Sequence, residues 1–329
     1  MAQAERPLSD HPTAAESADA RTTLAGLGEA AVLARIFPRL PAADAALLGP
    51  GDDAAVLAAP DGRYVVTTDM LVHGPDFRWE FSTPTDLGWK AAATNLSDVA
   101  AMGARPTALV VAIAAPQDTQ VDVLEGVADG LRLACAELAP GCGVVGGDLS
   151  TSDVFTIAVT AFGDLDGRRP VRRSGARPGD VVAVAGELGV AARGIALLFE
   201  SGLEAARGTD AHAVARQLRP MPPIALGVVA ADAGATAMMD VSDGLALDAR
   251  RLARASVVDI EFDALGDDQL RGGEDHSLLA TFPADVPLPD GFLRIGAVAP
   301  GVGRLLVSGS VFDELGGWDP YAQWDGRLS

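Results

Sequence analysis

Aspartates recur in this sequence at one kind of position, directly after a short apolar or β-branched run and beside glycine or a small hydroxyl residue. The positions with this arrangement are Asp52-Asp53, Thr67-Thr68-Asp69, Asp148, Asp240 with Asp243, and Glu274-Asp275. Any one of them is typical of an Asx-turn or a helix cap. Five in one chain indicate carboxylates at strand ends that share a site. Such carboxylates repel one another unless cations lie between them.

The cation that suits this set is Mg²⁺. Hard cations take oxygen ligands, and Mg²⁺ usually combines one or two carboxylates with phosphate oxygens and water. Asn95 and Asp98 lie one turn apart in a predicted helix, so they share a face. The neighbouring glycines allow the backbone to approach a phosphate closely. The residue types therefore predict a magnesium site that handles phosphates.

Sequence signatures of other chemistries are absent. There is no G-x-x-x-x-G-K-[ST] phosphate-binding loop and no G-x-S-x-G nucleophile elbow, and the four histidines lack metal-ligand spacing. A G-x-G-x-x-G string occurs at 141–146. It follows a predicted helix and leads into a strand, which is the reverse of a dinucleotide-binding fingerprint. We therefore expect neither a P-loop nor a Rossmann-type site.

Composition narrows the class of protein further. The 329 residues are 49% hydrophobic and carry a formal net charge of −20, so we expect no general affinity for nucleic acid or anionic membranes. Lys90 is the only lysine, and Cys135 and Cys142 are the only cysteines. Two cysteines are too few for a disulfide framework, and neither a signal peptide nor a membrane span is evident. These features predict a cytoplasmic protein with reduced thiols.

Helices and strands are expected in an irregular order that favours an α+β fold over a strictly alternating βαβ array. Helices are expected at 24–40, 84–102, 121–138, 188–201, 209–218, 222–234 and 245–255. Strands are expected at 54–58, 63–68, 108–114, 144–145, 154–162, 181–185, 237–240, 257–262, 277–282 and 294–298. Thr83 should cap the 84–102 helix, with Pro84 in its first turn and Gly103 at its end.

A stretch rich in Arg, Gly and Pro at 163–179 marks a domain boundary. We therefore expect a disordered tail at 1–21, an N-terminal domain at 22–165 and a C-terminal domain at 166–329.

Seven strings along the chain resemble the thiamine-monophosphate kinase family. They are GPGDDAAV (49–56), TTDML (67–71), KAAATNLSDVAAMGARP (90–106), GGDLS (146–150), RSGARPGD (173–180), DVSDGL (240–245) and GGEDHSLL (272–279). They stand in the family's order and cover roughly residues 24–321. The resemblance implies a two-domain fold like that of aminoimidazole ribonucleotide synthetase. It also implies a homodimer formed by the N-terminal α/β domains, which bind ATP and Mg²⁺, and a C-terminal α+β domain. The activity it implies is transfer of the ATP γ-phosphoryl group to thiamine monophosphate, giving thiamine diphosphate and ADP.

The resemblance also implies which residues form the site. The expected ligands of several Mg²⁺ ions are Asp53, Thr67, Thr68, Asp69, Asp98, Asp148, Asp240 and Asp243, with Asp52 as a weaker candidate. ATP is expected at Gly147, Asp148, Arg173 and Ser242. Thiamine monophosphate is expected at Asp76, Glu274 and Trp318. Solvation is the alternative for Arg173, which lies in an Arg-rich stretch, and simple packing is the alternative for Trp318, whose indole face suits a thiazolium cation.

One position departs from the family pattern. The family usually has a histidine followed by phenylalanine after the TTDML string, where this chain has Asp76-Phe77, with His73 three positions earlier. Asp76 either faces the positive ring of the substrate or has lost the contact. The departure concerns substrate binding more than the phosphoryl chemistry.

The expected mechanism is direct in-line transfer without a phospho-enzyme, because no nucleophile with a paired base is evident. A phosphate acceptor has a second pKa near 6, so it needs no general base at neutral pH. Two alternatives remain open. One is another ATP-dependent enzyme of the same superfamily, although the first 50 residues lack the cysteine expected of a selenophosphate synthetase. The other is a non-catalytic nucleotide-binding relative.

Overall fold

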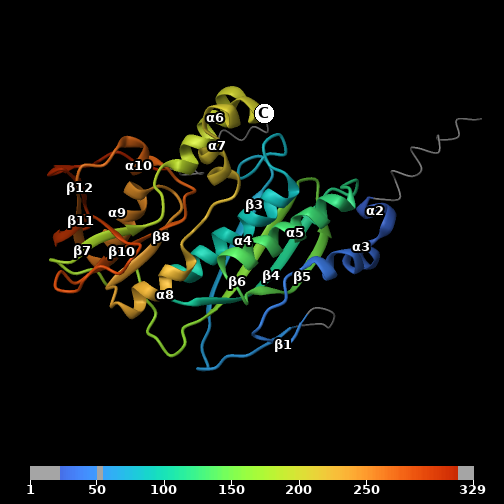
Figure 1. Ribbon diagram of the computed structural model, residues 1–329, viewed down its shortest axis with the longest axis horizontal. Coiled ribbons are helices and arrows are strands. Elements are labelled where there is room, and N and C mark those ends of the chain that lie inside the picture. The colour runs from blue at the N-terminus through green and yellow to red at the C-terminus, as the bar shows by residue number, and fades with distance from the viewer. Residues whose placement is uncertain (1–22, 50–54, 318–329) are drawn as a thin grey trace, which may run out of the picture.

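The computed structural model describes residues 23–49 and 55–317 (Figure 1). The 1–21 tail, Asp52, Asp53 and Trp318 lie outside the described residues. The described chain forms a four-stranded sheet from residues 65–164, a seven-stranded sheet from residues 181–311, and a small β1–β2 pair (Ala46–Leu48 with Val56–Leu57). Figure 1 shows the two larger sheets side by side, each with its own helices.

The first large sheet has the order β3-β6-β4-β5, with β3 (Val65–Val72), β6 (Thr156–Asp164), β4 (Arg105–Ala115) and β5 (Gly143–Thr151). The pairs β3–β6 and β6–β4 are antiparallel, whereas β4 and β5 run parallel. Helices α4 (Pro84–Ala101) and α5 (Val121–Leu138) pack on one face. They approach closely at two glycines: a Cβ on Gly88 would lie 2.0 Å from the carbonyl oxygen of Val127, and one on Gly130 would lie 2.2 Å from that of Thr85. β3 and β5 are the two edges of this sheet.

Helix α4 carries much of the site, and its ends follow from its sequence. The Thr83 hydroxyl accepts from the Asp86 N–H, and the Asp86 carboxylate accepts from the Thr83 N–H. This capping box satisfies two otherwise unpaired donors. Gly103, with φ of 74°, adopts a conformation that favours glycine just beyond the helix. The predicted cap and end of this helix are confirmed.

The second large sheet has the order β13-β12-β9-β11-β7-β10-β8 and is antiparallel except for the β12–β9 pair. Its strands are β7 (Val181–Ala185), β8 (Ala237–Val241), β9 (Val258–Phe262), β10 (Ser277–Phe282), β11 (Leu293–Pro300), β12 (Leu305–Val307) and β13 (Ser310–Val311). Helix α9 (Leu245–Ser256) packs on one face and α8 (Ile224–Asp232) on the other. Helices α6 (Val190–Ser201) and α7 (Leu203–Leu218) form a hairpin, and α7 is kinked at Asp210.

The two sheets meet through α4. A Cβ on Gly227 of α8 would lie 2.1 Å from the carbonyl oxygen of Ala100, so only glycine allows this approach. The buried Trp89 donates from Nε1 to the carbonyl oxygen of Pro220 at 2.8 Å. Helix α4 therefore packs against both the N-terminal and the C-terminal half of the chain.

Most predicted elements are present, with four kinds of difference. The expected helix at 24–40 is broken at Gly28 into α2 (Leu24–Leu27), α3 (Glu29–Ile36) and the 3₁₀ turn η1 (Phe37–Arg39). Strand β5 is much longer than the expected 144–145. The expected helix at 209–218 is the second half of α7. Strands β1, β12 and β13 and the short helix α10 (Asp267–Arg271) were not predicted. None of the helices in the described ranges has the length and apolar character needed to cross a membrane.

Candidate active site

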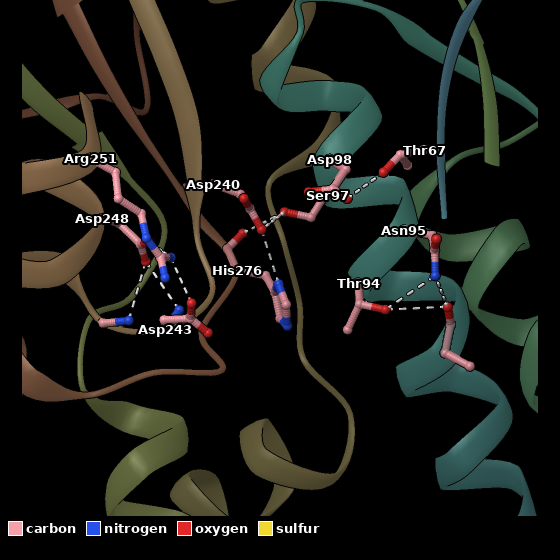
Figure 2. A network of polar contacts seen from close by, with 12 residues as sticks. Thr67, Thr94, Asn95, Ser97, Asp98, Asp240, Asp243, Asp248, Arg251 and His276 are labelled. Carbon is pink, nitrogen blue, oxygen red and sulfur yellow. Dashed lines mark hydrogen bonds and ion pairs between the residues drawn. The ribbon is translucent and has the colours of Figure 1, made fainter. Parts of the chain in front are cut away.

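Strand β3 and helix α4 bring the first group of acidic and polar residues together. Thr67 points from β3 toward α4, where its hydroxyl donates to Asp98 Oδ2 at 2.8 Å (Figure 2). Asp69 lies two positions further along β3 and therefore on the same face of the sheet. The Asp69 N–H donates to Asn95 Oδ1 at 3.0 Å. Asn95 and Asp98 thus share a face of α4, as predicted. They lie over the middle of β3, because the Thr67–Asp69 segment lies within this strand and not at its end.

Helix α4 also faces β8 of the other sheet. The Ser97 hydroxyl donates to Asp240 Oδ2 at 3.3 Å, and His276 Nδ1 lies 3.2 Å from the same oxygen (Figure 2). Asp240 is 4% exposed. Ser97 and Asp98 are neighbours in α4, so this helix brings Asp98 and Asp240 into one region although 142 positions separate them.

The loop after β8 holds Asp243 beside this region. Asp248 Oδ2 accepts from the N–H groups of Asp243 and Gly244 at 3.0 and 3.2 Å. Arg251 Nη1 donates to Asp243 Oδ2 at 2.6 Å and to Asp248 Oδ1 at 2.7 Å (Figure 2). The cap of α9 is Gly244. Asp243 is therefore not a helix cap, and Asp248 and Arg251 fix its orientation.

These carboxylates destabilise one another's ionised forms. Burial, and then the charges of Asp240 and Asp69, raise the pKa of Asp98 to about 7. Burial raises the pKa of Asp69 too, and the charges of Asp240, Asp243 and Glu274 add to this effect. Burial together with the Asp243 and Asp240 charges raises the pKa of Asp248 to about 7. A divalent cation among these oxygens would remove the repulsion, so the donor set fits Mg²⁺.

Within the described ranges, no three Asp, Glu, His or Cys side chains converge tightly enough to hold a metal ion by themselves.

A cavity of about 400 Å³ lies next to the carboxylates, between the β3–α4 loop, the α6–α7 hairpin and the loops that precede α9 and β10. Asp76, Ser242 and Glu274 line it, as do Arg78, Lys90, Arg271, Gln217 and the apolar side chains of Phe77, Phe81, Ile195, Leu198, Phe199 and Leu218. A mainly apolar cavity lined by both acidic and basic side chains suits an organic ligand that carries charged groups. Two of the three residues predicted to bind the substrate thus line one cavity.

Glu274 stands at a special backbone position in this cavity. Its φ of 70° is uncommon for a residue other than glycine, and its N–H donates to the Ser242 carbonyl oxygen at 2.7 Å. The carboxylate forms an ion pair with Lys90. Burial alone would raise the pKa of Glu274, but the Lys90 ammonium and His276 more than offset this effect, so the pKa lies below its ordinary value.

Asp76 enters the cavity from the β3–α4 loop. Its carboxylate accepts from the Val72 N–H at 2.7 Å. Burial raises its pKa, the Val72 N–H opposes this effect, and the Glu274 charge adds to it. The rings of His73, Phe77, Trp79 and Phe155 pack together at centroid distances of 4.9–6.1 Å and hold the loop in place.

Four predicted site residues lie elsewhere. Asp148 lies within β5 and not at a strand end, and it is exposed. Asp148 pairs with Ala112 of β4, which pairs with Ala158 of β6, which in turn pairs with Met70 of β3. Paired residues share a face, so Asp148 lies on the face of the sheet opposite α4. Gly147 is its neighbour in β5, which is an edge strand. The Thr68 hydroxyl points away from α4 and donates to the Val159 carbonyl oxygen at 3.0 Å.

Arg173 is exposed, and its carbonyl oxygen accepts from Ser256 at the last residue of α9. Asp243 precedes the other end of α9. A 12-residue helix is about 18 Å long. Within one chain, Arg173 is therefore remote from the carboxylates at Asp243.

Sequence reasoning missed Lys90, Ser97, Asp248 and His276 as members of the site. Ser97 and Lys90 belong to the same string as Asp98, and that was the available signal. His276 likewise belongs to the same string as Glu274, but its contact with Asp240 joins β8 to the start of β10 across the sheet and could not be read from that string. Its Nε2 has no hydrogen-bond partner in the described part of the chain.

Comparisons with known proteins decide the family. The AIR synthase related protein N-terminal domain matches residues 51–165, and the corresponding C-terminal domain matches 177–285. A thiamine-monophosphate kinase of Mycobacterium tuberculosis is 44% identical over 97% of this chain and 98% of its own length, and one of Corynebacterium glutamicum is 42% identical over 75% and 80%. This chain belongs to the thiamine-monophosphate kinase family.

Solved structures of the family have the same fold. The thiamine-monophosphate kinase of Stenotrophomonas maltophilia aligns with a TM-score of 0.72 at 34% identity, covering 85% of this chain and 95% of that one. The complex of AaThiL with AMPPCP and TMP aligns with a TM-score of 0.72 at 33% identity, covering 81% and 90%. The expected two-domain α+β fold is confirmed.

Proposed function

We propose that this chain is a thiamine-monophosphate kinase that transfers the γ-phosphoryl group of ATP directly to thiamine monophosphate, with Mg²⁺ held by the carboxylates of β3, α4 and β8. The observation that carries the proposal is the adjacency of two features. A mainly apolar cavity with acidic Glu274 and Asp76 lies beside a group of mutually repelling aspartates. The cavity suits a cationic ring, and the aspartates suit metal-bound phosphates.

Each half of the site has its own task in this mechanism. Glu274 and Asp76 bind the thiazolium end, which aims the substrate phosphate at Asp69, Asp98, Asp240 and Asp243. These residues would hold Mg²⁺, and the metal supplies neutralisation of the two polyanions that must meet. The acceptor oxygen is already largely deprotonated at neutral pH. The chain therefore needs to position the reactants and does not need to remove a proton.

Other predicted ligands complete the proposal. Asp53, Thr67, Thr68 and Asp148 are expected to contribute to the metal sites, and Gly147, Asp148, Arg173 and Ser242 to ATP binding. Trp318 is expected to cover the thiamine end. The domain limits 22–165 and 166–329 remain predictions, and a cytoplasmic location fits two cysteines that are both free and buried.

We also propose a homodimer through the first sheet. Its face opposite α4 exposes Val66 and Met70, each 58% exposed, and Asp148 shares this face. An exposed apolar sheet face of this kind is typical of an interface. Pairing two such faces would place Asp148 of each subunit in the interface, on the face of the sheet that also carries Thr68 of β3.

The deciding experiment is product analysis. Purified protein is incubated with ATP, Mg²⁺ and thiamine monophosphate, with and without EDTA, and the products are separated by chromatography. We expect thiamine diphosphate and ADP in equal amounts, and neither with EDTA. ADP without thiamine diphosphate would mean that another acceptor is used, and no turnover of either substrate would favour a binding protein.

A second experiment addresses direct transfer. The protein is incubated with γ-labelled ATP and Mg²⁺ in the absence of acceptor, then denatured and washed. No label should remain on the chain, and trapping of a phosphorylated residue would contradict the direct mechanism.

A further inference from the structure

Lys90 is an unusual residue in this chain. All the other 24 basic residues are arginine, and this single lysine has a side chain only 6% exposed. Arginine is a planar fork with a wide set of donors, whereas lysine presents a compact charge on a flexible stem. Among the arginines and the lysine that the structure describes, Lys90 is the one fixed cation that is buried. This points to a local requirement for a small ammonium group.

The surroundings of Lys90 show what the ammonium holds. Nζ forms an ion pair with Glu274 Oε2. The Gln217 amide, oriented by its neighbours, accepts from Nζ at 3.2 Å and donates to the Ala191 carbonyl oxygen at 3.0 Å. Lys90 lies on α4, Gln217 on α7, and Glu274 in the loop before β10. The ammonium therefore joins three elements at the wall of the cavity.

Glu274 depends on this contact. Its backbone is in the left-handed region, and its side chain remains 43% exposed toward the cavity. The charged groups around it are Lys90 from α4, Asp76 from the β3–α4 loop, Asp69 from β3, and His276 in its own loop, and Arg78 and Arg271 line the same cavity. Asp76 and Asp69 repel a second negative charge. Lys90 is the fixed positive charge that forms an ion pair with Glu274.

We infer that Lys90 is a positioning residue that holds the Glu274 carboxylate aimed into the cavity, so that Glu274 can bind the cationic ring of the substrate. Oε2 is engaged by Lys90, which leaves the other oxygen to face the ligand. This inference rests on the proposed function. It assigns to Lys90 a role in recognising the thiamine end and none in the transfer step.

The test is Lys90→Met, which removes the charge and keeps a side chain of similar length. We expect the KM for thiamine monophosphate to rise by about 10- to 100-fold, as for loss of a buried charged contact. The KM for ATP and kcat should stay within about threefold, since the contact is not made at the transferring phosphate. Calorimetric titration with unphosphorylated thiamine, which keeps the cation and lacks the phosphate, should show the same loss of affinity.

A pH profile separates this role from simple packing. In wild type, Glu274 should remain ionised from pH 6 to 8. Without Lys90, the effect of burial on the Glu274 pKa is no longer offset by the ammonium, so thiamine affinity should fall more on acidification than it does in wild type. Lys90→Arg restores the charge with a larger group, so its thiamine affinity should depend on pH almost as little as that of wild type.

Arg219→Met is the matched control. It removes an ion pair between α7's C-cap and Asp86, a buried carboxylate that also lies on α4. Neither residue lines the cavity. We expect a similar loss of thermal stability and an unchanged KM for thiamine monophosphate.

The outcomes are distinguishable. If Lys90→Met matches Arg219→Met in every property, or weakens ATP and thiamine monophosphate equally, the positioning role is wrong while the kinase remains. If wild type forms no thiamine diphosphate and does not bind thiamine, the proposed function fails, and the inference fails with it.

Discussion

Two carboxylate groups in this protein have opposite electrostatics. On α4, the half-buried Asp98 lies among like charges, and partial burial together with Asp240 and Asp69 raises its pKa to about 7. In the second sheet, Asp259 is buried. It accepts from the N–H groups of Val302 and Arg304 and from the Arg304 guanidinium, and although burial opposes them, these donors lower its pKa to about 2. The first arrangement costs stability without a cation, whereas the second contributes stability by itself.

This contrast separates functional from structural acids in a chain with 45 acidic residues. An aspartate whose hydrogen bonds are all supplied by the fold does not need a ligand. An aspartate that lies beside other aspartates needs a cation to offset their repulsion. Substitutions of the two kinds of aspartate should therefore have different effects.

The largest effect is expected for Asp69→Asn and Asp148→Asn, which keep volume and remove ligand charge. Each should reduce kcat by at least about 10³-fold, since the proposed mechanism depends on metal-assisted charge neutralisation. Circular dichroism should show little change in folding. Full activity in either variant would show that the metal-site assignment is wrong.

Mixing the two inactive variants tests the dimer. Suppose that each site combines Asp69 of one subunit with the partner subunit's Asp148. About half of the dimers that form in the mixture then contain one subunit of each variant, and one of the two sites in such a dimer has both aspartates. Co-expression should then restore about a quarter of wild-type activity. If both residues act within one chain, the mixture should stay inactive. A monomer by light scattering would also contradict the proposal.

The next effect concerns stability. Asp259→Ala leaves two backbone N–H groups without their acceptor, and we expect a loss of about 2–3 kcal/mol in the free energy of unfolding. Because the folded-state pKa is lowered, the contribution of Asp259 is present above about pH 4 and is lost as the pH falls toward 2. Denaturant titrations at pH 7 and pH 2.5 should therefore show a smaller difference at the lower pH, and kcat at pH 7 should be unchanged.

Asp98→Asn should change stability in the opposite direction. The folded-state pKa of Asp98 is raised, so metal-free wild type loses stability as the pH rises from about 4 through 7. At pH 8 with EDTA, we expect the variant to be more stable by about 1–2 kcal/mol. Addition of Mg²⁺ with ATP should raise the melting temperature of wild type more than that of the variant. If the metal-free variant is instead less stable than metal-free wild type, Asp98 is a structural acid like Asp259.

The smallest effect is expected for Asp76→Asn. The amide oxygen can still accept from the Val72 N–H, so the loop should keep its shape. Only the charge facing the substrate is lost, and steady-state kinetics should give a rise of about 3- to 10-fold in the KM for thiamine monophosphate. An unchanged KM would indicate that this chain has lost the contact.

Local patterns predicted much of this architecture. The limits of α5 and β7 follow from apolar periodicity and β-branched runs, and the start of α4 from Thr83, Pro84 and Asp86. The aspartates were recognised because small residues beside them resemble strand ends. The same feature misled at Asp148: the glycines and serine around it suggested a strand end where the structure has the interior of β5.

Contacts between distant segments were not predictable in this way. The pairing of Lys90 with Glu274 spans 184 positions, and nothing in either segment encodes the partner. The order of the seven-stranded sheet and the short helix α10 likewise depend on packing between remote residues. The residue types of the ligands could therefore be predicted from the sequence, whereas their contacts and the shifts in their pKa values depend on the fold.

Helix α4 has a further consequence for how the molecule comes apart. Ser97 binds Asp240, Trp89 binds the Pro220 carbonyl oxygen, and Ala100 packs on Gly227, so each end of one N-terminal helix is completed by the C-terminal half. The segment near residues 165–180 that connects the two halves is therefore not expected to act as a hinge between them. Separately expressed halves should each leave an apolar helix face in water and aggregate, and heating the whole chain should give one cooperative transition.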